Sequence, residues 1–160
     1  MNKKCSSCGI EKPLTKFRLV QGKKKYGSRN ECRTCYNVNF KNLILKEQGI
    51  DSWDNYVFNN FKDRIRSRTR LAFIRIKENK PVKTEQLLGC DWMTAKLHIE
   101  TFFTDELNWD NFHEWHIDHI IPLCSVSTIE ELIPLCKYTN LQPLKAIDNL
   151  KKGGRLFKIK

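Results

Sequence analysis

The chain has 160 residues, of which 29 are lysine or arginine and 18 are aspartate or glutamate, giving a formal net charge of +11 at pH 7. This length can bury one modest core with a small additional module. No apolar run reaches the length of a membrane span, and the first residues lack the apolar segment of a secretory signal. We therefore expect a cytoplasmic protein without a membrane partner, and the positive charge favours a polyanionic partner such as nucleic acid.

The charge is distributed unevenly along the chain. Residues 1–50 contain 12 basic and 3 acidic residues, whereas residues 85–118 contain 1 basic and 8 acidic residues. The regions on both sides of this acidic stretch are therefore candidates for phosphate-facing surfaces, although an ordinary solvated basic face has the same composition.

Four cysteines near the N-terminus form two C-x2-C pairs. Cys5 and Cys8 are separated from Cys32 and Cys35 by 23 residues. Thiolates paired at this spacing are typical of a closed tetrahedral zinc site, so we predict a structural Zn²⁺ in a module that spans residues 1–48. The absence of a secretory signal argues against a disulfide framework. The remaining cysteines lack paired spacing and are expected to be buried free thiols: Cys90, Cys124 and Cys136.

A basic loop lies between the two cysteine pairs. Lys23, Lys24 and Lys25 are consecutive and follow a glycine. Three point charges at a loop tip would suit contact with a DNA backbone, and such contact would weaken with salt. A solvated hairpin tip explains the same residues equally well.

The next region, residues 49–108, is expected to be helical and basic. A first helix over residues 37–48 should stop at Gly49, and a second should cover residues 55–78. Apolar residues at helical spacing predict the core stripe of this second helix: Phe58, Phe61, Ile65, Ala72 and Ile76. Further helices are expected over residues 84–90 and 91–103, with Asp91 as the cap of the latter.

The second helix also carries a series of arginines. Arg64, Arg66, Arg68 and Arg70 alternate along it. Because a guanidinium can bind phosphate through two hydrogen bonds, we interpret these residues as DNA-binding. The alternative is a solvated face on which arginine stems cover the core.

The C-terminal region, residues 109–160, contains the densest set of polar residues next to apolar runs. Residues 115–123 are expected to form a strand that carries Asp118 and His119, and residues 138–144 a returning strand. Thr128 should cap a short helix between them, and residues 146–152 should begin another helix. A hairpin covered by that helix would bring Asp118, His119 and Asn149 together.

That grouping suits hydrolysis of a phosphodiester bond. Asp118 and the amide oxygen of Asn149 are oxygen ligands of the kind that a hard divalent cation prefers. The histidine side chain titrates near neutrality, so His119 could take a proton from an attacking water molecule. One carboxylate, one amide and one histidine suit a one-metal mechanism better than a two-metal site.

The phrases WHIDHIIPL and YTNLQPLKAIDNLKKG resemble the HNH (ββα-metal) endonucleases, in the variant whose last motif position is Asn. They resemble small HNH proteins often encoded by bacteriophages, and GIEKPLTKF resembles the zinc-knuckle modules found ahead of phage HNH domains. The resemblance implies an α+β fold, with His119 as general base and with Asp118 and Asn149 holding Mg²⁺ or Mn²⁺. It also implies that Asn140 braces the loop between the strands. Its expected products carry 5′-phosphates, and its expected location is the host cytoplasm.

Three further residues are candidates for substrate contact. His116 lies two residues before Asp118 and so on the same strand face, where it could contact substrate or merely pack. Lys151 and Lys152 lie within one helical turn of Asn149 and could hold the scissile phosphate.

Two other functions remain open from the sequence. One is a zinc-containing DNA-binding or regulatory protein with an inactive HNH scaffold, and the other is a nuclease directed at RNA. A homodimer would place two active sites on opposite DNA strands, but neither nicking nor double-strand cleavage follows from these residues.

Overall fold

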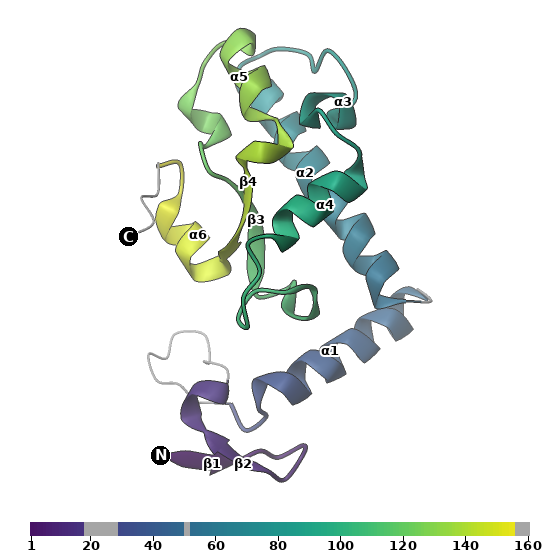
Figure 1. Cartoon of the computed structure of the whole chain (residues 1–160), viewed down its shortest axis with the longest axis vertical. Helices are drawn as coiled ribbons and strands as arrows, with labels where there is room; N and C mark the ends of the chain where they lie inside the picture. The colour runs from purple at the N-terminus through teal and green to yellow at the C-terminus, as the bar shows by residue number, and fades with distance from the viewer. Residues whose placement is uncertain (18–28, 50–51, 156–160) are drawn as a thin grey trace. The chain divides into compact units, whose positions relative to one another are not determined.

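The computed structural model describes residues 1–17, 29–49 and 52–155, and it divides the chain into two compact units, Met1–Trp53 and Asp54–Lys160. Both units combine helices with short antiparallel strands (Figure 1), which confirms the predicted α+β class. The helical region expected over residues 49–108 and the predicted C-terminal region share the second unit from residue 54 onward.

The first unit is a strand pair followed by a helix. Strand β1 (Asn2–Lys4) pairs antiparallel with β2 (Glu11–Pro13), and helix α1 (Arg33–Gln48) comes later in the chain. Helix α1 begins four residues earlier than expected because the extended Cys32 already occupies its N-cap position. It ends at Gly49, as predicted, where the left-handed backbone with φ 61° favours glycine.

The core of the first unit is small. Its buried cluster consists of Cys5, Phe17 and Cys32, with Cys35 partly buried against it. Helix α1 has no fully buried residue. Two of the three core residues therefore belong to the cysteine pairs, which leaves little apolar packing to hold this unit.

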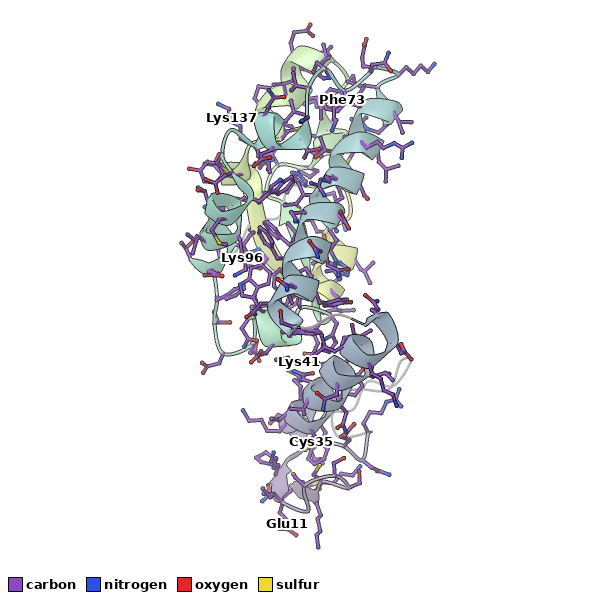
Figure 2. The ribbon with its side chains drawn as sticks, turned by 90° about the vertical axis from the view of Figure 1, so that its right-hand side faces the viewer. Glu11, Cys35, Lys41, Phe73, Lys96 and Lys137 are labelled. Atoms are coloured by element: carbon purple, nitrogen blue, oxygen red, sulfur yellow. The ribbon has the colours of Figure 1, made fainter. Side chains whose placement is uncertain are left out.

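The second unit is built on helix α2 (Trp53–Arg75). Its buried residues recur every three or four positions and form one stripe: Val57, Phe61, Ile65, Thr69, Ala72 and Phe73, the last marked in Figure 2. The predicted stripe is confirmed at Phe61, Ile65 and Ala72, whereas Phe58 and Ile76 are only partly buried. The helix ends before the predicted residue 78, and Lys77 takes a left-handed backbone with φ 61° just beyond it.

Two shorter helices follow α2. Helix α3 (Thr84–Leu88) precedes α4 (Trp92–Glu100), and Asp91 caps α4 by accepting a hydrogen bond from Thr94 N at 2.8 Å. The cap was predicted, but α4 ends three residues before the expected position.

The C-terminal part of the second unit contains a strand pair and a helix in the predicted order. Strand β3 (Trp115–His119) pairs antiparallel with β4 (Leu141–Lys145), so that Asp118 faces Gln142 across the pair. Helix α6 (Ala146–Lys152) begins at the predicted residue and packs on both strands. Helix α5 (Ile129–Leu135) lies between the strands in sequence.

Alternation along β3 separates its two faces. Trp115 and Ile117 point into the core, where the Trp115 ring contacts three other aromatic rings at centroid distances of 5.0–5.7 Å: Phe103, Trp109 and Phe112. His116 and Asp118 point to the opposite face and meet α6.

Within the described residues, no helix combines the length and apolarity needed to cross a membrane.

Candidate metal centre and active site

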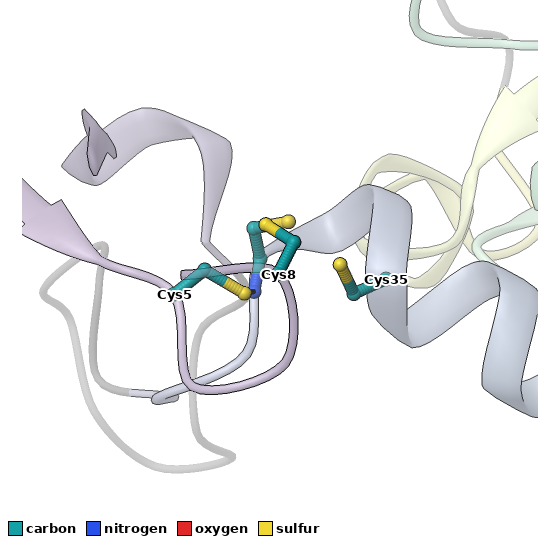
Figure 3. A group of neighbouring side chains, drawn as sticks. Cys5, Cys8 and Cys35 are labelled. Atoms are coloured by element: carbon teal, nitrogen blue, oxygen red, sulfur yellow. Dashed lines mark hydrogen bonds between the residues drawn. The ribbon is translucent and has the colours of Figure 1, made fainter. Parts of the chain in front are cut away.

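The four cysteines of the first unit form one cluster. The Sγ atoms of Cys5, Cys8, Cys32 and Cys35 all lie within 4.8 Å of one another. Figure 3 shows three of these side chains gathered at the start of α1. Four thiol groups at such distances suit tetrahedral coordination, so the cluster could hold a structural zinc ion.

Backbone hydrogen bonds fix the first cysteine pair. Cys5 N donates to Ile10 O and Gly9 N donates to Cys5 O, both at 3.0 Å, which closes a tight turn around Cys8. Gly9 has a φ of 69°, a conformation that a residue with a Cβ atom rarely adopts. The Cys32 N–H donates to Cys5 Sγ at 3.2 Å and so ties the second pair to the first.

The thiols of the cluster differ in acidity. Hydrogen bonds from the Cys32 and Cys8 backbone N–H groups lower the pKa of Cys5 to about 6. The hydrogen bond with the Cys32 thiol and burial raise the pKa of Cys35 to about 12. The Lys12 ammonium donates to Cys32 Sγ at 3.2 Å, and this bond raises the pKa of Lys12. The fold therefore already stabilises the thiolate form of Cys5, and a metal ion binds cysteine in this form.

A second candidate site is a cavity of about 440 Å³ in the second unit. Its polar lining comes from β3, α6 and α2 and comprises Asp118, His119, Asn149, Arg68 and Arg75. The structure thus brings together the three residues that the sequence analysis grouped by their order along the chain. It adds two arginines from a distant part of the sequence.

Asp118 is held by two donors. Gln142 Nε2 donates to Asp118 Oδ2 at 2.8 Å, and Lys152 Nζ donates to the same oxygen at 2.5 Å. The Lys152 side chain is 0% exposed and also donates to the carbonyl oxygens of His119 and Ile120. Lys152 was a candidate to hold the substrate phosphate, but its ammonium is buried against Asp118 and the end of β3.

His119 is buried at the cavity wall. Its Nε2 atom has no hydrogen-bond partner in the described part of the chain. Burial, followed by the positive charge of Arg68, lowers the pKa of His119 to about 4, even though Asp118 acts in the opposite direction. The imidazole is therefore neutral near pH 7 and able to accept a proton.

His116 contacts α6 through Asn149. Asn149 Nδ2 lies 2.8 Å from His116 Nδ1, and since an amide nitrogen only donates, His116 Nδ1 is the acceptor. Burial and the positive charges of Arg68 and Arg64 lower the pKa of His116. This bond fixes the amide plane of Asn149 at the cavity.

Asn140 does not line the cavity but connects the chain segments beside it. Its Oδ1 accepts from Ile121 N at 2.8 Å, and its Nδ2 donates to Ile121 O at 3.0 Å and to Leu135 O at 2.8 Å. Its backbone carbonyl accepts from Ile120 N at 2.8 Å. These bonds tie the segment that follows His119 to the start of β4.

Three arginines of α2 donate to backbone carbonyls of residues 112–123. The order of the arginines along α2 is the same as the order of the carbonyls along that segment. Arg64 donates to Phe112 O at 3.5 Å and Arg75 to Leu123 O at 2.8 Å, and Arg68 donates to Ile117 O between them. Ile117 and Pro143 form a non-hydrogen-bonded pair of the antiparallel strands, so the Ile117 carbonyl points away from β4 and is available to Arg68. Sequence reasoning missed this role, because the bond joins two segments that are far apart in the sequence.

The other predicted contact residues lie elsewhere or outside the described residues. Arg66 and Arg70 are exposed and do not line the cavity that contains Asp118 and His119. Lys151 is exposed and pairs with Asp148 at 3.4 Å. The loop residues Lys23, Lys24 and Lys25 fall outside the described ranges. Among the three other cysteines, the expectation of burial holds for Cys136, whereas Cys90 is partly exposed and Cys124 is exposed at the cavity.

Comparisons with known proteins give two similar viral proteins. No family model matches the chain, and no solved structure matches it. Uncharacterized protein L426 of Acanthamoeba polyphaga mimivirus is 34% identical over 93 residues, which cover 56% of this chain and 41% of that protein. Uncharacterized protein L246 of the same virus is 28% identical, over 92% of this chain and 82% of that protein. This chain thus spans less than half of L426, and both relatives come from a virus named for an amoeba rather than from a bacteriophage.

Proposed function

We propose that the chain is a metal-dependent endonuclease that hydrolyses DNA phosphodiester bonds in the cavity formed by β3, α6 and α2. The observation that carries this proposal is the convergence of a carboxylate, a neutral imidazole and an amide on one cavity, together with two arginines. Asp118 is fixed by Gln142 and Lys152, and Asn149 is fixed by His116.

The donor set fits a hard divalent cation. Within the described residues, Asp118 Oδ1 and Asn149 Oδ1 take no hydrogen bond, while the other polar atoms of both side chains are engaged. These two oxygens would hold Mg²⁺ or Mn²⁺. When bound, the ion would offset the charge that develops on the phosphate during hydrolysis.

The protein's own groups would then divide the remaining work. His119 Nε2 would accept the proton of the attacking water, since it has no other hydrogen-bond partner in the described part of the chain. Asn140 would keep the segment after His119 in place. Arg68 and Arg75 would contact the phosphate, because a guanidinium has five N–H donors and the carbonyl bonds use only some of them.

The test is cleavage of supercoiled plasmid by the full chain with and without added Mg²⁺. Magnesium should be omitted rather than chelated, because a chelator would also act on the cysteine cluster. Replacing His119 with alanine should slow nicking or linearisation by about 10²- to 10⁴-fold. The matched control is Lys137→Ala, an exposed position that does not line this cavity, and it should cut at the wild-type rate.

Each alternative predicts a different result. Equal cleavage by wild type and His119→Ala would contradict the assigned general base. Salt-sensitive DNA binding without cutting, with Mg²⁺ or Mn²⁺ and with several plasmids, would indicate a zinc-containing DNA-binding protein. Cleavage of RNA but not of DNA by the wild type, lost in His119→Ala, would reassign the substrate.

A further inference from the structure

The second unit contains another cavity, of about 380 Å³, whose lining is strongly basic. It is bounded by the C-terminal half of α2 and by the segment that leads into α3 and α4. Four cationic side chains and one carboxylate line it, next to an indole ring: Arg66, Arg70, Lys80, Lys83, Glu85 and Trp92.

Helix geometry separates this basic cavity from the catalytic cavity. Arg66 and Arg70 are four residues apart and so project from one face of α2. Arg68 and Arg75, which line the catalytic cavity, are rotated by roughly half a turn from Arg66 at about 100° per residue. The two cavities therefore open on opposite faces of the same helix.

Several contacts hold the walls of the basic cavity. Lys80 Nζ donates to the hydroxyl of Thr84 at 2.8 Å, and Thr84 is 4% exposed. The Arg66 guanidinium lies over the Trp92 ring at 5.1 Å. Arg70, by contrast, has no hydrogen bond or ion pair in the described part of the chain. The cavity thus combines positioned cations with a guanidinium that has all its donors available.

We propose that this basic cavity binds phosphates of the nucleic-acid backbone at a point away from the cut site. The identity of the nucleic acid rests on the function proposed above, whereas the phosphate chemistry rests on this cavity. A guanidinium binds a phosphate through two parallel N–H donors, and the neighbouring ammonium groups add point charges. Concentrating cations in a concave site around one carboxylate favours a polyanion over a neutral ligand.

The position of the basic cavity restricts the path that a bound nucleic acid can take. A helix with its side chains is about 10–12 Å wide, so α2 stands between the two phosphate sites. One straight segment cannot occupy both faces. A nucleic acid bound at both sites would bend around the helix or would present two separate segments.

The test measures binding of a fluorescent DNA duplex by anisotropy over a series of salt concentrations. The full chain carries His119→Ala and no Mg²⁺ is added, so that the DNA stays intact. Introducing Arg70→Gln or Lys83→Gln should raise Kd several-fold and reduce the slope of log K against log salt by about 1 for each lost phosphate contact. Lys137→Gln makes the same change of charge at an exposed site outside both cavities, marked in Figure 2, and should leave the slope unchanged.

A second variant should change binding in the opposite direction. Glu85 is the carboxylate in the lining of the basic cavity, and Glu85→Gln removes its repulsion of phosphate. Binding should therefore tighten. The control is Glu130→Gln, because Glu130 is also exposed in the first turn of a short helix, α5, and lines neither cavity. Loss of folding cannot produce this gain.

Three results would overturn the proposal. The first is an equal Kd and an equal salt slope for Arg70→Gln and Lys137→Gln. The second is that DNA does not bind at low salt. The third is that binding of inorganic pyrophosphate depends on Arg70 but binding of DNA does not. The plasmid assay separates this proposal from the nuclease proposal. A salt-slope effect of Arg70→Gln without any cleavage by the wild type would support the basic cavity and contradict the nuclease.

Discussion

Each of the two units of this protein is stabilised by a different kind of interaction. In Met1–Trp53 the buried cluster contains Cys5, Phe17 and Cys32, so two of its three residues are also candidate metal ligands. In Asp54–Lys160 large apolar side chains such as Phe61 and Trp115 are fully buried, and a polar network surrounds the strand pair. The stability of the first unit would therefore depend on an ion that its cysteine cluster could hold, whereas the second unit distributes its stability over many contacts.

The largest expected effect is the loss of one cysteine ligand. Cys32→Ser should unfold the first unit, because structural zinc sites contribute about 10–16 kcal/mol of apparent binding free energy in zinc-finger peptides. The second unit should stay folded. Zinc content and amide hydrogen exchange of both units would be measured, with Cys90→Ser as the control. Full zinc content and unchanged exchange protection in Cys32→Ser would show that packing holds this unit.

The next effect concerns the buried ion pair. Lys152→Met leaves Asp118 buried without its cation and should destabilise the second unit by about 3–5 kcal/mol. The adjacent Lys151→Met removes only a surface pair and should cost at most about 1 kcal/mol. Urea unfolding followed by the fluorescence of buried tryptophan gives both values. Adding Asp118→Asn to Lys152→Met should recover part of the loss, and no recovery would refute the charge explanation.

A smaller effect is expected at Asn140. Alanine at this position leaves the Ile121 N–H and two carbonyl groups without their side-chain partner, and it should cost about 1–3 kcal/mol. The exposed neighbour Thr139 provides the control, Thr139→Ala, measured in the same urea titration. Equal midpoints for the two variants would contradict the bracing function of Asn140.

The smallest effect depends on pH. The hydrogen bond from the Thr94 backbone N–H, followed by that from its hydroxyl, lowers the pKa of Asp91 below the ordinary value of 3.8. A lowered folded-state pKa contributes stability above the unfolded pKa that is lost as the pH falls through the folded value. The Tm of wild type should therefore slightly exceed that of Asp91→Asn at neutral pH and converge with it in acid. A constant difference at all pH values would exclude this linkage.

Local patterns in the sequence were sufficient to predict much of this structure. The two C-x2-C pairs predicted the cysteine cluster, because the ligands of a metal site repeat at short fixed spacings. Gly49 and Asp91 marked helix ends correctly, since capping involves only neighbouring residues. The start of α6 directly after the returning strand was also predicted correctly.

Contacts between distant segments could not be predicted in this way. Lys151 and Lys152 are adjacent and chemically identical, and only the docking of α6 on the strands decides which of them is buried. Likewise, Arg64 and Arg68 were interpreted as DNA-binding from their charge, but their bonds to backbone carbonyls of Phe112 and Ile117 depend on the packing of α2. A pattern of charges does not specify which partner each charge will meet.

The ordered arginine bonds of α2 also restrict how this chain can evolve. Inserting or deleting one residue between Arg64 and Arg75 would rotate everything beyond it by about 100° around the helix. The carbonyl contacts and the division of cations between the two cavities would then be lost together. Homologous chains that keep this architecture should therefore accept changes of length in their loops but not within α2.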